Sequence, residues 1–294
     1  MSARAEGSDP RRGAVLLMVL VLGLVASSVT VVALRASSAG VRSATVFVDE
    51  MRAEALGQAA TDLVAAAVAS GRPDAARAGA FRSRFADGEA IVEYRAETAR
   101  VDLNLAAPEL MTTLFEAAGA EPRVARELAD RVVDWRDPDS AKRPSGAERD
   151  DYRAAGRSGP ANRPFSHMAE VEGVLGMGRG LLARLAPAVT VASGSARVDP
   201  ILADPLVVLA LMGGDRRRTE DFLALRRQPF ARMEDVTAPF PNASRAFIGL
   251  DGGKAVRAAI RIVLRDGFER RYEAVVGGAE AGAGPSVLAW ESVK

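Results

Sequence analysis

An uncharged stretch near the N-terminus reads AVLLMVLVLGLVASSVTVVAL over residues 14–34. Coiled as an α-helix, these residues would be roughly 31 Å long, which matches the hydrocarbon thickness of a bilayer. Arg4, Arg11 and Arg12 precede the stretch, and basic residues favour the cytoplasmic end of a membrane span. We therefore expect a single-pass inner-membrane protein with a short cytoplasmic N-terminus and a periplasmic body.

Three interpretations of this N-terminus compete. A secretory signal peptide usually has an apolar region of only about 7–15 residues, and the sequence around Arg11-Arg12 is a poor match for twin-arginine export. A type IV prepilin leader needs a short basic lead and a Gly directly before the apolar run, and Gly13 followed by Ala14 meets that need. We favour the leader, which predicts cleavage after Gly13, a mature chain that begins at Ala14, and retention of the apolar segment.

The helical pattern continues beyond the apolar stretch. Apolar residues recur at helical spacing and form an amphipathic stripe; they are Val41, Ala44, Val48, Met51 and Ala55. The sequence Ser70-Gly71-Arg72-Pro73 ends the pattern, because Gly and Pro both stop helices. We predict one long helix over 14–70, half of it in the membrane and half packed on a soluble domain. The alternative is a plain signal anchor followed by a stalk.

Strand patterns follow the long helix. Asp87-Gly88 is a hairpin turn signal, and apolar residues alternate with mostly polar ones over 90–97. Residues 100–103 are expected to form the next strand. This block predicts the first part of a small sheet over 71–105.

The end of the chain has the same character. Apolar residues alternate with polar or small ones over 256–264, and Asp266-Gly267 turns the chain. Residues 268–276 are predicted to return as a strand, and 288–293 to add a last one. The two blocks together predict an α+β fold in which 251–294 complete an antiparallel sheet.

Helix-rich sequence between the strand blocks contains two matched pairs of motifs. Residues 101–108 and 198–205 both read V-D-x-x-L-A-x-P, and each continues into an apolar helix that ends in Gly. Residues 164–171 and 229–236 both read P-F-x-x-M-x-acid-V. The order is the same in both copies, so we predict a duplication. The first helical module covers 106–190 and contains an insertion, and the second covers 191–250.

The first module contains a turn that is typical of helix-hairpin-helix proteins. Residues 171–178 read VEGVLGMG, and Leu181 and Leu185 follow at helical spacing. In DNA binders of this type, backbone N–H groups at the turn grip a phosphate. The same turn also serves as packing in protein–protein modules. A net charge of +1 and a location outside the cytoplasm favour packing.

The insertion in the first module is rich in carboxylates. They are Asp134, Asp137, Asp139, Glu148, Asp150 and Asp151. Clustered carboxylates on a loop are suitable calcium ligands, although the spacing does not fit an EF-hand, which needs Gly where Lys142 stands. Neighbouring Arg and Lys side chains also allow a salt-bridged, solvated loop. Calcium binding and a salt-bridged loop both remain open, and the second is favoured.

Composition excludes several classes of function. The chain has 294 residues, with 39 basic and 38 acidic residues, no Cys and a single His. The absence of Cys excludes disulfides, Cys-based zinc sites and thiol nucleophiles. With His167 as the single histidine, the sequence gives no support for a His-based triad. No strongly basic field indicates a nucleic-acid partner. A non-enzymatic protein is expected.

These residues together resemble one family. The motifs are Arg11-Arg12-Gly13 with its apolar run, Val101-Asp102-Leu103-Asn104, Asp134-Trp135-Arg136-Asp137-Pro138-Asp139, Gly146-Ala147-Glu148 with Tyr152, Pro164-Phe165 and Leu175-Gly176-Met177. They are similar to those of the minor pseudopilin K of type II secretion systems, along most of the chain. The leader alone is shared by all pilin-like proteins, whereas the Asp-Trp and Gly-Ala-Glu blocks are specific together.

The resemblance implies a fold, a role and partners. The fold would be a pseudopilin α+β core with a SAM-like or helix-hairpin-helix-like insertion. Prepilin peptidase would cleave after Gly13 and methylate Ala14. The protein would form the tip of a periplasmic pseudopilus with minor pseudopilins I and J, above the major pseudopilin and the inner-membrane secretion platform. Some family members bind calcium.

Two positions depart from the pattern of pilins or of this family. Pilins generally carry Glu as the fifth residue of the mature chain, where this sequence has Met18. That Glu is thought to neutralise the amine of the subunit above, so an apolar residue suits a subunit with nothing above it. Val198-Asp199-Pro200-Ile201 stands where an Asn-rich stretch is common in the family, which puts any function of that loop in doubt.

Two rival functions remain as alternatives. A membrane-anchored helix-hairpin-helix protein for DNA uptake would bind duplex DNA in a salt-dependent way, and absence of binding at low salt would remove it. An anchored periplasmic hydrolase ranks last, because the sequence contains no nucleophile–base motif.

Overall fold

The computed structural model describes residues 10–70, 77–228, 230, 232–278 and 286–293, and it separates two compact units, Met1–Ala55 and Leu56–Lys294. The helices are α1 (Pro10–Ala69), α2 (Pro108–Ala117), α3 (Pro122–Arg136), α4 (Arg149–Ala154), α5 (Arg179–Leu185), α6 (Pro205–Leu211), α7 (Arg216–Leu225), α8 (Met233–Thr237) and α9 (Asn242–Arg245), with the 3₁₀ helices η1 (Glu97–Ala99) and η2 (Met168–Gly173). The strands are β1 (Ala78–Arg84), β2 (Gly88–Ala96), β3 (Val101–Asp102), β4 (Val189–Thr190), β5 (Ala255–Leu264), β6 (Glu269–Gly277) and β7 (Ser286–Val293). The finer six-part division stays a prediction.

Helix α1 is apolar on all sides in its N-terminal part. The large side chains described between Val15 and Val31 are all exposed around the helix. No helix in the described part of the chain contains an apolar window long enough to span a membrane. The predicted span over 14–34 is therefore not confirmed. The side chains of Leu16 and of residues 32–34 lie outside the described ones.

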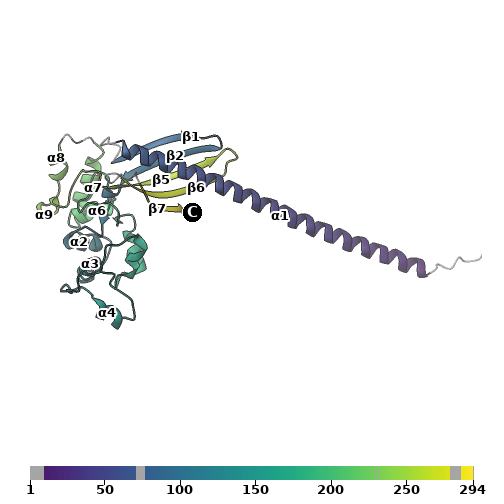
Figure 1. Cartoon of the computed structure of the whole chain (residues 1–294), viewed down its shortest axis with the longest axis horizontal. Coiled ribbons are helices and arrows are strands. Elements are labelled where there is room, and N and C mark those ends of the chain that lie inside the picture. The colour runs from purple at the N-terminus through teal and green to yellow at the C-terminus, as the bar shows by residue number, and fades with distance from the viewer. Residues whose placement is uncertain (1–9, 71–76, 229, 231, 279–285, 294) are drawn as a thin grey trace, which may run out of the picture. The chain divides into compact units, whose positions relative to one another are not determined.

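The main sheet has the strand order β1-β2-β5-β6-β7, with antiparallel neighbours throughout (Figure 1). The two hairpins predicted from Asp87-Gly88 and Asp266-Gly267 are both present, and Gly267 takes a left-handed conformation with φ of 90°. Burial alternates along β2 and β5, and most of their apolar residues lie on the buried side. The α+β fold and the strands over 256–264, 268–276 and 288–293 are confirmed.

One face of the sheet is covered by the last turns of α1. Ala60 and Val64 are fully buried there. Trp290 of β7 stacks on Tyr272 of β6 with ring centroids 4.8 Å apart, and a Cβ added at Gly57 would lie 2.8 Å from the Trp290 ring. A glycine in the helix therefore allows the indole to approach its backbone closely.

The strand expected over 100–103 does not join the main sheet. Val101 and Asp102 form β3, which pairs in parallel with β4, Val101 opposite Val189. The prediction of a strand is confirmed, but its assignment to the sheet is wrong. Parallel neighbours need a long crossover connection, here the helices between β3 and β4, and local alternation carries no information about such a distant partner.

Helices α2 to α9 lie in the long connection between β2 and β5 (Figure 1). Pro occupies the first turn of α2, α3 and α6, where its missing N–H costs nothing. Helix α2 packs against both α3 and α6. Aromatic side chains fill much of the core, with Phe222 and Phe240 in edge-to-face contact at 4.7 Å.

The same contacts recur in the two halves of this helical region. Val101 pairs in parallel with Val189, and Val198 forms an equivalent parallel bridge with Ile248. The N–H groups of Val101 and Val198 each donate to a carbonyl oxygen at 2.8 Å, and the acceptors are Ala188 and Phe247.

Arginines at the ends of α3 and α7 show the same correspondence between the two halves of the helical region. Arg136, at the end of α3, donates from Nη1 to Leu103 O at 2.5 Å and from Nη2 to Ala106 O at 2.9 Å. Arg226, at the end of α7, donates to Pro200 O at 3.1 Å and to Ala203 O at 2.6 Å. These carbonyls occupy matching places in the two V-D-x-x-L-A-x-P motifs, so the matched sequences form matched structures.

The second pair of motifs agrees where it is described. His167 and Arg232 take the same extended conformation, with φ of −154° and −142°, just before η2 and α8. Val171 and Val236 are both fully buried. Pro229 and Ala231 lie outside the described residues.

Candidate functional site

The predicted processing segment lies at the start of α1. Residues 10–13 are helical, but their side chains and residues 1–9 are outside the described part of the chain. Ala14 is exposed, and the Met18 side chain is 66% exposed. Cleavage after Gly13, methylation of Ala14 and the meaning of Met18 therefore stay predictions.

The carboxylate loop is organised around Asp134. Its side chain is fully buried and accepts hydrogen bonds from Ala147 N at 2.9 Å and from Arg143 N at 3.3 Å. Gly146 passes so close to this carboxylate that an added Cβ would overlap it. The loop thus folds over the end of α3 because one buried acceptor collects its N–H groups. Burial raises the pKa of Asp134, and the charge of Asp137 raises it further.

Two further carboxylates of the loop have buried oxygens without a hydrogen bond of ordinary geometry, although Glu148 is placed as the N-cap of α4. Asp137 Oδ1, Glu148 Oε1 and Glu148 Oε2 are buried and have no hydrogen-bond partner among the residues that the structure describes. Burial raises the pKa of Glu148, and the charges of Asp134 and Asp137 raise it further. Burial likewise raises the pKa of Asp137, with Asp139 as the next cause. For Asp137, burial and the like charge of Asp139 thus outweigh the positive charges of Arg143 and Arg136 nearby.

The other two predicted carboxylates have different partners. Asp151 binds Lys142 Nζ at 2.7 Å and accepts from Glu148 N at 2.8 Å. The exposed Asp150 binds Arg153 at 2.7 Å. The six carboxylates therefore form two groups. Asp134, Asp137, Asp139 and Glu148 lie close enough for their charges to affect one another's pKa. Asp150 and Asp151 form salt bridges instead.

The carboxylate oxygens of this loop are suitable ligands for a cation, but they do not converge on a common point where an ion would be held. Within the described chain, no three acidic or imidazole side chains converge as a metal site would require. The orphaned oxygens of Asp137 and Glu148 are the ligands that Ca²⁺ prefers. Calcium binding stays a prediction, and its donors would be these two residues with Asp134 and Asp139.

An aromatic cluster lies beside the carboxylate loop. Trp135 stacks on Phe165 with ring centroids 5.8 Å apart and planes within 3°, and contacts Tyr152 at the same centroid distance. A Cβ at Gly173 would overlap the Trp135 ring. The Asp-Trp, Gly-Ala-Glu and Pro-Phe motifs thus meet in one place, with Tyr152 among them.

The helix-hairpin-helix-like turn is part of the same packing. Gly176 takes a left-handed φ of 89° between η2 and α5. Leu175 N donates to Tyr152 Oη at 3.0 Å, and Leu175 O accepts from Arg131 Nη1 at 3.0 Å. Met177 N donates to Val174 O at 3.0 Å. The N–H groups of Leu175 and Met177 are thus engaged in packing within the protein.

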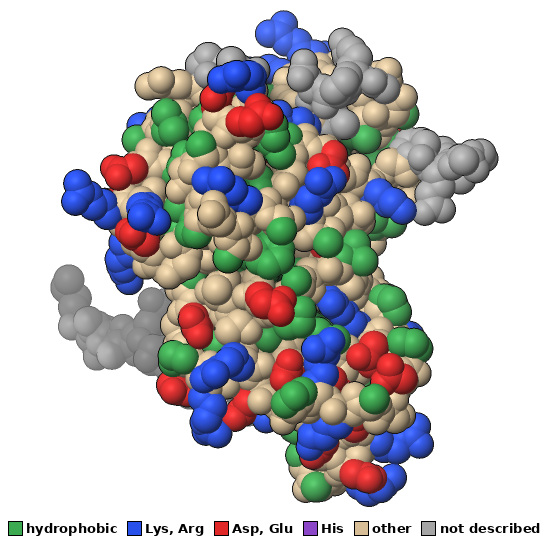
Figure 2. All heavy atoms as spheres, turned by 90° about the vertical axis from the view of Figure 1, so that its left-hand side faces the viewer, with side chains coloured by type: hydrophobic (Ala, Val, Ile, Leu, Met, Phe, Trp, Pro, Cys, Tyr) green, Lys and Arg blue, Asp and Glu red, His purple; other side chains and the backbone are tan. Residues whose placement is uncertain are grey.

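Charge on the visible face of the helical region is mixed. Figure 2 shows basic and acidic side chains interspersed over this face, without a continuous basic field. Nucleic-acid surfaces concentrate Lys and Arg on one face. This face therefore does not favour the rival DNA-binding function.

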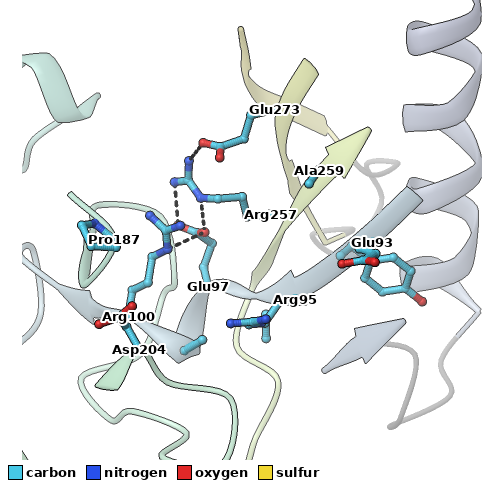
Figure 3. Close-up of a pocket in the computed structure, with 12 residues that line it drawn as sticks. Glu93, Arg95, Glu97, Arg100, Pro187, Asp204, Arg257, Ala259 and Glu273 are labelled. Atoms are coloured by element: carbon cyan, nitrogen blue, oxygen red, sulfur yellow. Dashed lines mark hydrogen bonds and ion pairs between the residues drawn. The ribbon is translucent and has the colours of Figure 1, made fainter. Parts of the chain in front are cut away.

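An ionic cluster lies where the helical region meets the sheet (Figure 3). Glu97 is fully buried and accepts from Arg257 Nε at 2.7 Å and from Arg257 Nη2 at 3.2 Å. Thr190 of β4 donates to Glu97, and Arg257 also bonds Glu273 of β6. Burial lowers the pKa of Arg257, but the bonds and charges of Glu97 and Glu273 outweigh burial and raise it overall. The cluster links β5 and β6 to the inserted helices.

Sequence patterns did not reveal this cluster. Glu97 continues the outward positions of Glu93 and Arg95 along β2, which is typical of solvent-facing residues. It is buried because the helical region folds over that end of the strand. A pocket of about 270 Å³ adjoins the cluster, with Arg100 and Asp204 among its lining residues (Figure 3). No local signal could have identified these residues.

A comparison with protein-family models gives one decisive match. Residues 90–194 match the family model for protein K of the type II secretion system. Residues 90–194 therefore form a domain of the type II secretion system protein K family. The matched segment contains the Asp-Trp, Gly-Ala-Glu and Pro-Phe motifs, so the residues that suggested protein K are those that meet in the aromatic cluster.

The protein K fold is also found in a solved structure. The chain is similar to a chain in the crystal structure of the GspK–GspI–GspJ complex from the type 2 secretion system of enterotoxigenic Escherichia coli. The TM-score is 0.62 at 17% sequence identity, and the match covers 84% of this chain and 97% of that one. A comparison with curated proteins gives no match. Family and fold together support a minor pseudopilin.

Proposed function

We propose that this protein is a minor pseudopilin at the tip of the type II secretion pseudopilus, where it starts assembly and contributes to protein export across the outer membrane. The observation that carries the proposal is the family match over 90–194, on a chain that shares its fold with a member of the GspK–GspI–GspJ complex. The role is structural, not enzymatic.

The N-terminus supports insertion and processing. The exposed side chains over 17–25 are apolar on every side of α1, as a helix surrounded by lipid requires. Gly13 directly precedes the apolar stretch 14–34 and is the proposed cleavage point, after which prepilin peptidase would methylate Ala14. Before assembly, residues 14–34 would anchor the chain in the inner membrane, with its body in the periplasm.

Met18 supports the position at the tip. A carboxylate inside a bilayer or a helix bundle is costly unless it is paired. A Glu at this point would be paired only if another subunit lay above. An apolar side chain is thus suited to a subunit that ends the fibre.

Partners follow from the proposed position. Minor pseudopilins I and J would contact the protein directly, the major pseudopilin would follow below, and the inner-membrane secretion platform would receive the assembly. Co-expression of the full-length chain with its cognate proteins I and J is expected to give a complex that remains intact in size-exclusion chromatography. Separate elution of all three proteins would contradict the proposal.

Labelling tests the tip itself. Antibodies against the helical region should label one end of pseudopili that form when the major pseudopilin is overproduced. Label along the whole fibre would overturn the tip position but leave membership of the family untouched. Loss of export on deletion of the gene, restored by the intact chain, is the expected control.

A further inference from the structure

Strand β7 forms an open edge of the main sheet. Within the described part of the chain, β7 pairs with β6 alone (Figure 1). The register shifts between Val275 and Val276, and beyond that point the pairing of residues 289–293 is regular. The backbone groups of an edge strand that face away from the sheet can pair with another extended chain.

The two edges of the sheet differ in their protection. Strand β1 reads AGAFRSR, and its exposed Arg82 and Arg84 discourage pairing at that edge. Strand β7 reads SVLAWESV, with neither Lys, Arg nor Pro. Val287, Leu288 and Val293 are 51%, 53% and 45% exposed. Strand β7 thus contains no basic residue or proline, and Glu291 is the one charged side chain within the strand.

Hollows lie beside β7 on the sheet face opposite α1. One cavity of about 540 Å³ is lined by Ala289, Val275 and the helical region's Met168 and Val191, among others. A second, of about 270 Å³, lies toward the end of β7 and includes Val293 in its lining. Apolar residues such as Ala289 and Val293 line part of each hollow, and Glu273 belongs to both linings. Side chains of an added strand could therefore be buried on either side of the middle of β7.

The charges on β6 and β7 indicate which side chain an added strand would need between these hollows. Glu291 of β7 lies directly opposite Glu273 of β6 in the register, and like charges in that position are destabilising. Arg257 pairs with Glu273. No ion pair involves Glu291 among the described residues, and its side chain is exposed. A basic side chain on the open side of β7 would compensate Glu291.

We propose that β7 is a docking strand for an extended segment of a partner polypeptide, with a basic residue opposite Glu291 and apolar residues two positions away on either side. The main-chain hydrogen bonds would extend the sheet, and the side chains opposite Ala289 and Val293 would occupy the two hollows. A second copy of β7 cannot supply the basic residue, since its sequence contains none. This inference goes beyond the tip role and does not rest on it.

Peptide binding to the full-length chain in detergent tests the proposal. The probes are the fluorescent peptide STVTKTVTS, the same peptide with Glu in place of Lys, and the Lys peptide with alternate backbone nitrogens methylated. The Lys peptide should bind about tenfold more tightly than the Glu peptide, as expected when one cross-strand repulsion becomes an attraction. Methylation should abolish binding, because it removes the donors of the added strand.

Charge exchange provides the decisive arm. Glu291→Lys should reverse the preference so that the Glu peptide binds more tightly, whereas Arg84→Glu, on the opposite edge, should leave it unchanged. Both positions are exposed, and cooperative thermal unfolding of each variant should confirm that it folds. Small shifts in melting temperature are expected from the facing residues Glu273 and Glu89. Equal binding of the two peptides, no binding, or an unchanged preference in Glu291→Lys would overturn the proposal. So would self-association that Arg84→Glu abolishes, since the occupant would then be β1 of a second copy.

Discussion

At the scale of residues, Gly146 and Asp134 depend on each other. The carboxylate is buried and collects N–H groups from the loop, and it does so in space that any side chain at Gly146 would fill. The Gly-Ala-Glu motif is thus explained by one close approach. The raised pKa values of Asp134, Asp137 and Glu148 follow from burial in the same loop.

Gly146→Ala should destabilise the protein by about 1–3 kcal/mol or more, because an added methyl group in a filled site forces displacement. Urea unfolding would measure the change. Gly178→Ala is the matched control, since nothing lies within 4 Å of the added Cβ and its φ of −80° is ordinary. Equal stability of the two variants would contradict the steric account.

Glu148→Gln should raise the free energy of unfolding at pH 7 in calcium-free buffer. A raised carboxyl pKa means that the folded protein binds this proton more tightly than the unfolded chain, so the ionised group costs stability at neutral pH. That cost disappears as the pH falls through the raised pKa of Glu148 toward its ordinary value of 4.5. The advantage of the variant should therefore shrink by pH 4 in urea titrations, and an advantage that grows on acidification would refute this sign.

Calcium should raise the melting temperature if the orphaned oxygens are ligands. Saturation at about 100 times the dissociation constant would add about 2.7 kcal/mol. Glu148→Gln should reduce the shift, while Asp150→Asn, at a salt-bridged and exposed position, should retain it. Identical shifts in wild type and both variants, or none with 10 mM CaCl₂, would show that this loop does not hold the ion.

At the scale of elements, two arginines perform the same task in two related modules. Arg136 and Arg226 each clamp two carbonyl oxygens of a V-D-x-x-L-A-x-P loop at the end of a helix. The clamp keeps the loop against its module, and its recurrence explains why the motif is present twice.

Arg136→Met should destabilise the protein by about 2–4 kcal/mol, because two charge-assisted bonds are lost and their acceptors are left in a partly buried place. Arg126→Met, on the exposed side of the same helix, should change the free energy of unfolding by less than about 0.5 kcal/mol. Chemical denaturation of both variants decides the matter. A small effect of Arg136→Met would mean that water replaces the arginine.

Local sequence patterns predicted where the strands lie better than which strands pair with each other. Alternation and Asp-Gly turns were sufficient for β2, β5 and β6, since each hairpin is specified by neighbouring residues. They assigned Val101 to the wrong sheet, because β4 lies 88 positions further along the chain (189 − 101). The burial of Glu97 and the capture of Asp151 by Lys142 also depend on distant or folded-loop geometry. Composition could suggest an acidic loop but not which carboxylates remain unpaired.

At the scale of the whole molecule, the inserted helices carry the motifs that match protein K, and the sheet presents an open edge at β7. In the proposed function, the N-terminal segment decides how the chain enters an assembly. The proposed tip role depends most on that last part, since only a processed and retained apolar helix can pass from a membrane into a fibre.

The intact mass of the protein isolated from cells tests this claim most directly. The account predicts a chain that begins at Ala14, heavier by one methyl group, and the full-length mass in cells that lack prepilin peptidase. Gly13→Leu should give the uncleaved chain as a control. Retention of residues 1–13 in normal cells, or a new N-terminus near 36–40 as a signal peptidase would leave, would contradict the account.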